Sequence, residues 1–254
     1  MNKASHTFGQ AAAAYASARP TYPAALFDWL AEVAPRRGPG EGNVWDVGTG
    51  NGQAALDLAA RFSQVYATDF SAAQIAAAKP APNITYAVAP AESTALADGW
   101  ADLITVANAL HWFDFARFWP EVKRVGAKEA AFAAWGYNWM RVSERFDAEV
   151  VSAFRAIIAP FWAANNRINW DGYRDTDIQF PFTRIAHPDF VIRMPWTFHQ
   201  VMAFMQTWSA FRLSRENAGA VKAMDALTAK LEKTYGGDEV YDVRMPLVMV
   251  AGRV

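Results

Sequence analysis

The chain has 254 residues, which is enough for one large domain, or one domain with an insertion, whose core needs no disulfide or metal staples. Hydrophobic residues make up 53% and charged residues 19%, which excludes a disordered or fibrous protein. A net charge of −1 argues against broad binding to nucleic acid, and the absence of cysteine excludes disulfides, thiolate metal sites and cysteine nucleophiles.

Two further classes are disfavoured by local patterns. The N-terminal stretch lacks the apolar core of a signal peptide, and no run approaches the ~20 apolar residues of a membrane helix, so we expect a cytoplasmic protein without membrane association. The four histidines are scattered without metal-binding spacing, so no metal site is expected.

Residues 1–42 form a predicted N-terminal helical cap. Apolar residues at helical spacing predict a helix near residues 8–17 and another that begins after Pro23. The Arg, Gly and Pro residues of 36–42 predict a loop that ends the cap.

Residues 43–135 alternate between predicted strands and helices. Strands are expected at 44–47, 65–68, 84–88, 102–108 and 130–135, and helices at 53–62, after the Ser71–Gln74 capping box and from Asp114 to Val125. This alternation is typical of βαβ units, so we expect a parallel sheet that is covered on both faces.

Residues 136–254 are less regular. Helices are expected near 143–160, from the Thr197–Gln200 capping box and from Ser214 to about Tyr235, with short strands at 180–185 and 190–194 and a closing strand at 244–250. Pro246 interrupts the closing strand, which suits an edge position or a bulge.

A glycine-rich loop lies where the first strand turns into the first helix, with the sequence Asp46-Val47-Gly48-Thr49-Gly50-Asn51-Gly52. Glycines permit a tight turn and let a ligand approach the backbone, and the following helix offers free amides. Asp69 ends the second strand, where a carboxylate can accept both hydroxyls of a ribose. The pattern therefore indicates a nucleoside-containing ligand.

Two ligands compete for this loop. The run Gly50–Ala55 satisfies the GxGxx(G/A) fingerprint of dinucleotide binding. Asp46, however, places a negative charge beside the glycines, which would repel a pyrophosphate and suit an ammonium or sulfonium cation. This favours S-adenosylmethionine over NAD.

At this point the sequence resembles the class I S-adenosylmethionine-dependent methyltransferases, in particular the small-molecule group that includes trans-aconitate methyltransferase-like enzymes. The resemblance rests on the glycine loop, on the stretches after the second, third and fourth strands, and on the approach to and exit from the fifth strand; these are 46–52, 69–75, 91–92, 108–114, 124–126 and 133–138. Residues 126–129 depart from the family, which usually carries Pro-Gly-Gly there. It implies a seven-stranded, mostly parallel, doubly wound sheet of the Rossmann-like methyltransferase fold with an inserted helical or irregular lid. The corresponding parts are the cap 1–42, a cofactor-binding α/β core 43–135, a substrate lid 136–215, and a C-terminal helix and closing strand of the core over 216–254.

The same resemblance implies roles for individual residues. The loop residues would cradle the methionine part of the cofactor, with Asp46 near its ammonium directly or through water. Asp69 would hold the ribose, Phe70 would pack on the adenine, and Ala91 and Glu92 would read its amino edge. The other cofactor-binding candidates lie under the ribose and sulfonium or in the cap; they are Asn108, Ala109, Tyr15, Arg19 and Tyr22.

His111, which follows the fourth strand, is the candidate for catalysis. Its ordinary pKa near 6.5 suits a general base. Methyl transfer from a sulfonium needs mainly positioning, so substrate contact or packing beside Trp112 is the alternative role. Trp112, Tyr137 and Trp208 are the substrate-binding candidates.

The lid carries 16 aromatic residues, nine Arg and no Lys. One interpretation is an aromatic wall in which one or two Arg bind a small carboxylated or planar acceptor. The other is an aromatic core with Arg on a solvated face.

The sequence thus predicts methyl transfer from S-adenosylmethionine to a small-molecule acceptor, with S-adenosylhomocysteine as product. An NAD(P)-dependent oxidoreductase and a non-catalytic S-adenosylmethionine-binding protein are the alternatives. Neither nucleic acid nor a membrane is an expected partner, and the sequence leaves open a monomer or a homodimer.

Overall fold

A computed structural model describes residues 20–35 and 41–254. These residues divide into two compact units, and each is described by itself. The core unit comprises residues 22–138, 165–191 and 246–254, and the helical unit comprises residues 139–164 and 192–245 together with residues 20–21.

The core unit is built on a mixed sheet. Its strands are β1 (Asn43–Val47), β2 (Gln64–Asp69), β3 (Ile84–Val88), β4 (Ala101–Ala107), β5 (Gly126–Tyr137), β6 (Thr183–Arg184) and the second half of β8 (Val240–Arg253). They follow the order β3-β2-β1-β4-β5-β8-β6, with β7 (Val191–Thr197) paired to β8 off this path. The first five run parallel, whereas β8 is antiparallel to β5. The predicted α/β class with a mostly parallel sheet is confirmed, and the described sheet has eight strands.

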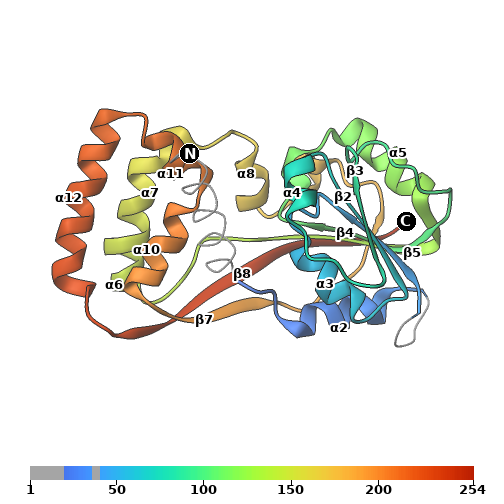
Figure 1. Cartoon of the computed structure of the whole chain (residues 1–254), viewed down its shortest axis with the longest axis horizontal. Helices are drawn as coiled ribbons and strands as arrows, with labels where there is room; N and C mark the ends of the chain where they lie inside the picture. Colours follow the sequence, from blue (N-terminus) through green and yellow to red (C-terminus); the bar gives the residue numbers. More distant parts are fainter. Residues whose placement is uncertain (1–19, 36–40) are drawn as a thin grey trace, which may run out of the picture. The chain divides into compact units, whose positions relative to one another are not determined.

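Helices cover both faces of this sheet (Figure 1). They are α2 (Ala24–Val33), α3 (Gln53–Ala59), α4 (Ala72–Ala76), η1 (Leu110–Trp112), α5 (Phe115–Val125), α8 (Asn166–Trp170) and α9 (Asp175–Ile178). Leu30 of α2 and Leu58 of α3 pack with Trp135 on one face. Phe118 of α5 packs with Phe132 on the other. The sheet is therefore buried on both sides, as its continuous apolar strands require.

The caps expected from the sequence hold the core helices at the strand ends. The Ser71 hydroxyl accepts from the Gln74 backbone amide at the start of α4, and Asp114 accepts from the Ala116 amide at the start of α5. Only this half of the predicted Ser71–Gln74 capping box forms, because the Ser71 amide donates to the Asp69 carboxylate. Each cap satisfies one amide that the first helical turn leaves without a partner.

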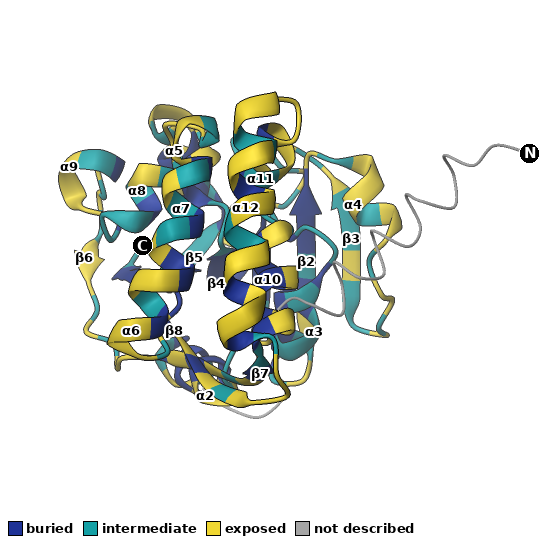
Figure 2. Cartoon of the chain, turned by 90° about the vertical axis from the view of Figure 1, so that its left-hand side faces the viewer, coloured by how far each residue is buried: buried dark blue, intermediate teal, exposed yellow. Residues whose placement is uncertain are grey.

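The helical unit consists of helices, β7 and the first half of β8. Its helical segments are α6 (Glu144–Phe146), the π-helical η2 (Asp147–Ser152), α7 (Ala153–Ile158), η3 (Ala159–Phe161), α10 (Phe198–Gln206), α11 (Ser209–Ser214) and α12 (Ala218–Tyr235). The predicted Thr197–Gln200 capping box starts α10. Most of α12 is exposed (Figure 2), and its buried residues are Met224, Leu231 and Tyr235, whose helical spacing places them on one side.

The boundaries between the units differ from the predicted ones. Residues 165–191, predicted as part of the lid, belong to the core unit, where the Trp119 indole of α5 donates to the Ile178 carbonyl at 2.8 Å. The helix α12, predicted to belong to the core, belongs to the helical unit. The predicted assignment of both segments differs because an apolar face in the sequence does not indicate which other surface it packs against.

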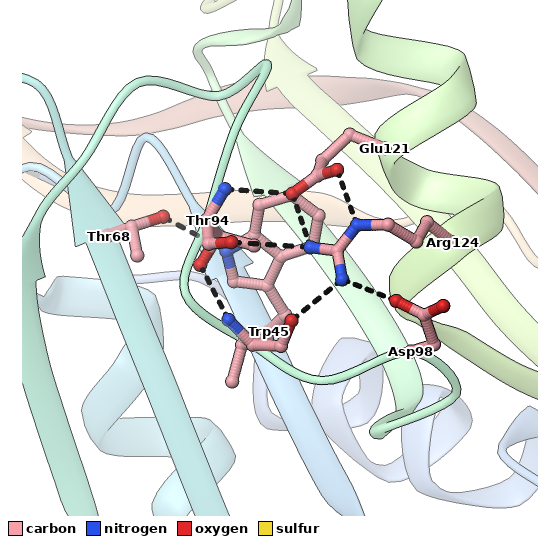
Figure 3. A network of polar contacts seen from close by, with 7 residues as sticks. Trp45, Thr68, Thr94, Asp98, Glu121 and Arg124 are labelled. Carbon is pink, nitrogen blue, oxygen red and sulfur yellow. Dashed lines mark hydrogen bonds and ion pairs between the residues drawn. The ribbon is translucent and has the colours of Figure 1, made fainter.

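A polar network fixes the loop between β3 and β4 (Figure 3). The Arg124 guanidinium donates to both carboxylate oxygens of Glu121, to Asp98 and to the carbonyls of Thr94 and Leu96. Glu121 in turn accepts from the Thr94 amide at 2.7 Å. The network ties this loop to α5.

Candidate functional site

The glycine loop follows β1, and its three glycines all adopt positive φ. A Cβ on Gly48 would lie 2.8 Å from the Ala109 Cβ, and one on Gly52 would collide with the Tyr86 ring. On Gly50 a Cβ would meet only the Gln74 Oε1, at 3.9 Å. Gly48 and Gly52 are therefore required for packing, whereas Gly50 is the glycine with an open face.

Asp69 holds this loop in place. Its carboxylate accepts from the Gly50 amide and from the Ser71 amide, each at 2.9 Å. The Thr49 amide adds a bond to the Thr68 carbonyl on the same strand. Because each carboxylate oxygen has a further lone pair, Asp69 can accept two more hydrogen bonds from a ligand.

Asp46 lies beneath the loop and has no exposed surface. Its two oxygens accept from the hydroxyls of Thr49, at 2.6 Å, and Thr105, at 2.8 Å. Burial raises the pKa of Asp46 to about 6. Neither oxygen reaches the surface, so this arrangement disfavours a direct contact with a ligand ammonium, which the resemblance implied as one possibility beside a contact through water. Asp46 and Thr49 instead support the loop from below.

An exposed aromatic ring stands beside Asp69. Phe70 exposes 82% of its surface, which is unusual for a phenyl side chain. Ala91 is nearly buried after β3, and the Glu92 Oε1 accepts from the Asp114 amide at 3.0 Å. Glu92 thus holds the start of α5 with one oxygen and has the second oxygen for other partners.

The end of β4 carries Asn108, Ala109 and His111. Asn108 adopts a positive φ of 56°, and its backbone N–H donates to the Trp135 backbone carbonyl. His111 is 4% exposed, and burial lowers its pKa to about 4. Its ring is therefore neutral near pH 7 and a poor proton acceptor, which disfavours the general base that the sequence suggested. The adjacent Trp112 is 53% exposed.

Several buried polar atoms have no partner within the described part of the chain. They are Asn51 Oδ1, His111 Nδ1, Trp135 Nε1, Asn169 Oδ1 and Tyr173 Oη. All five residues belong to the core unit. Buried polar groups are normally hydrogen-bonded, so these atoms indicate partners that residues 20–35 and 41–254 do not supply.

Asn169 and Tyr173 were not expected as site residues. A Cβ on Gly136 would lie within 3.1 Å of the amide oxygens of both Asn108 and Asn169, so these two oxygens converge over β5. Asn169 also donates to the Tyr137 carbonyl. The Asn169 side chain lies over β5 because α8 packs in the core unit rather than in the helical unit. No local sequence pattern predicts this packing.

The remaining candidates are spread between the units. The Tyr22 ring lies 5.7 Å from that of Trp135 in the core unit. Tyr137 is at the end of β5, whereas Trp208 belongs to the helical unit. Tyr15 and Arg19 lie outside the described residues.

Within residues 20–35 and 41–254, no group of three or more His, Cys, Asp or Glu side chains is placed to hold a metal ion. Among the same residues, no helix combines the length and apolar character needed to cross a bilayer.

Comparison with known proteins assigns the family. Residues 45–134 match the family model described as a methyltransferase domain. A Dictyostelium discoideum protein named as a methyltransferase is 27% identical over 252 residues, which covers 97% of this chain and 94% of that protein. A Mycobacterium tuberculosis methyltransferase is 38% identical over 120 residues, 47% of each chain.

A solved structure from Anaeromyxobacter dehalogenans, described as a type II methyltransferase, is 38% identical and covers 92% of this chain and 97% of its own, with a TM-score of 0.83. The chain belongs to the class I methyltransferases. Methyl transfer is its reaction class, which decides against the NAD(P)-dependent oxidoreductase.

Proposed function

We propose that this methyltransferase transfers the methyl group of S-adenosylmethionine to a small-molecule acceptor, and that the cofactor binds at the glycine loop of the core unit. The observation that carries the proposal is the junction of β1 and β2. There the Asp69 carboxylate accepts a hydrogen bond from the amide of Gly50, the glycine with open space beside it, and has further lone pairs with which to bind a ligand. The adjacent Phe70 ring is exposed.

The residues present fit this cofactor. Asp69 would accept the ribose hydroxyls, Phe70 would cover the adenine, and the Glu92 oxygen that is not bonded to Asp114 would accept from its amino group. The unpartnered Asn51 Oδ1 in the loop would accept from the ammonium of the methionine part. Asp46 would stabilise that cation through the field of its buried carboxylate rather than by contact.

When bound, S-adenosylmethionine supplies an activated methyl group on its sulfonium. The chain's own contribution is to orient the acceptor and to exclude water. The orphaned atoms of His111, Asn169 and Tyr173 would hydrogen-bond to polar groups of the acceptor in the core unit. His111 is then a positioning residue, because its lowered pKa makes proton uptake unfavourable.

A ligand series tests the cofactor site. Calorimetric titration should show binding of S-adenosylhomocysteine and none of NADH. If Asp69 contacts the ribose, the 2′-deoxy form of S-adenosylhomocysteine should bind about tenfold more weakly to the wild type, since one hydrogen bond to a carboxylate is lost. Asp69→Ala should bind both forms weakly and with equal affinity. An undiminished difference between the two forms in Asp69→Ala would refute the ribose contact.

A turnover screen tests the reaction. Carboxylic acids, phenols and amines are offered with S-adenosylmethionine, and release of S-adenosylhomocysteine is measured. Release with one class assigns the acceptor atom. Cofactor binding without release by any of these small molecules would overturn the proposed acceptor class and favour a binding protein.

A further inference from the structure

Most arginines of the predicted lid are accounted for by ion pairs. Seven of the nine form ion pairs with carboxylates at the protein surface; these are Arg141, Arg145, Arg167, Arg174, Arg184, Arg193 and Arg215. For these seven the solvated-face interpretation fits. Arg155 and Arg212 are the two without a carboxylate partner among the described residues, and Arg212 is exposed.

Arg155 is different in its surroundings. It lies on α7 and is half-buried, and its guanidinium carbon is 3.5 Å from the centroid of the Trp139 ring. Burial, and then repulsion from Arg141, lowers its pKa. Among the described residues, Arg155 is thus a partly desolvated cation whose charge is offset by an aromatic face and by no carboxylate.

Trp139 belongs to a cluster of three half-buried indoles, the tryptophan cluster, formed with Trp162 and Trp208. The ring centroids are 6.1 Å apart for Trp139 and Trp162, 5.6 Å for Trp139 and Trp208, and 5.9 Å for Trp162 and Trp208. All three residues and Arg155 belong to the helical unit, so this unit builds the arrangement by itself.

Arg155 and the tryptophan cluster together favour one class of ligand. A half-buried cation without a counter-ion is unfavourable, and a cation–π contact compensates it only in part. A guanidinium stacked on a ring presents its N–H groups at its edge, in the fork that matches a carboxylate. The indole faces favour a flat apolar group. An anion with a planar apolar body satisfies both.

We propose that Arg155 and the tryptophan cluster bind a planar organic anion, a carboxylate joined to an aromatic or conjugated group. Binding of such an anion does not depend on the cofactor site.

Three matched probes test the site by calorimetry: trans-cinnamate, its neutral amide cinnamamide, and S-adenosylhomocysteine. The wild type should bind cinnamate at least tenfold more tightly than cinnamamide, because only cinnamate pairs with Arg155. Arg155→Met should lose that preference, and Arg155→Lys should keep only part of it because an ammonium lacks the planar fork. Arg212→Met is the control for removal of a lid arginine and should behave as the wild type.

The outcomes separate this inference from the proposed function. Equal affinity for cinnamate and cinnamamide in the wild type, no measurable binding of cinnamate, or an equal loss in Arg212→Met would overturn the anion site. Failure of the wild type to bind S-adenosylhomocysteine would instead overturn the cofactor proposal. Arg155→Met should fold, since it removes an uncompensated charge, and unchanged affinity for S-adenosylhomocysteine verifies this in the same sample.

Discussion

Asp46 and His111 are two buried ionisable side chains, and the pKa of each is shifted in the direction that favours its neutral form. Burial raises the pKa of Asp46 to about 6 and lowers that of His111 to about 4. Both shifts have the same cause, since burial disfavours a charged group of either sign. Their effects on the pH dependence of stability have opposite signs.

For Asp46, the folded state binds its proton more tightly than the unfolded state. The stabilisation is complete below pH 3.8 and is lost as the pH rises to about 6. We expect the free energy of unfolding of Asp46→Asn, relative to the wild type, to rise by about 2–3 kcal/mol over this window and to stay level above it. Urea unfolding at a series of pH values measures this difference. A difference that is constant with pH would contradict the raised pKa.

For His111, the unfolded state binds the proton more tightly. The contribution of neutral His111 to the free energy of unfolding is complete above pH 6.5 and is lost as the pH falls to about 4. The advantage of the wild type over His111→Gln should therefore grow by about 3 kcal/mol from pH 4 to pH 6.5. The same urea series on this variant serves as the counterpart to Asp46→Asn. Slopes of equal sign in the two variants would show that one of the assignments is wrong.

At the scale of elements, α5 positions one side of the candidate site. Its N-terminus is held by Asp114 and, through the Asp114 amide, by Glu92. Its last turn carries Arg124, which fixes the loop that precedes β4. The loop between β3 and β4 is therefore held by hydrogen bonds to both ends of α5.

Replacement of Arg124 should release this loop. Arg124→Ala removes the donors to two backbone carbonyls and two carboxylates, so we expect a loss of about 1.5–3 kcal/mol in the free energy of unfolding. Arg124→Lys keeps the charge without the fork and should lose about half as much. Equal stabilities of the wild type and Arg124→Ala in urea would show that the network is too solvated to contribute.

At the scale of the whole molecule, the chain passes between its two units five times, after residues 21, 138, 164, 191 and 245. Residues 247–253 of β8 complete the sheet beside β5. A fragment of residues 22–138 would end before this strand and expose the edge of β5. Such an unpaired edge favours aggregation, so neither unit is a simple excision from the sequence.

The two proposed ligands should protect different units. We expect S-adenosylhomocysteine to slow hydrogen exchange in residues 46–52 and 69–71, and trans-cinnamate to slow it in α7 and α11. Binding stabilises the amides whose opening breaks the ligand contacts, so each effect should be confined to the unit that builds the site. Mass spectrometry of exchanged peptides reads out both. Protection of the same peptides by both ligands would contradict two independent sites.

The sequence by itself determined the α/β class, the glycine loop and the strand ends at which Asp69 and Asn108 lie. These features depend on residue spacing and on short-range turn and capping chemistry, which are local. Tertiary structure alone decided that Asp46 is buried, that residues 165–191 return to the core with Asn169 and Tyr173, and that Arg155 is half-buried with no carboxylate partner in the described part of the chain. Each depends on which distant surface an apolar face buries against, and a periodic pattern specifies that a face is apolar but not its partner.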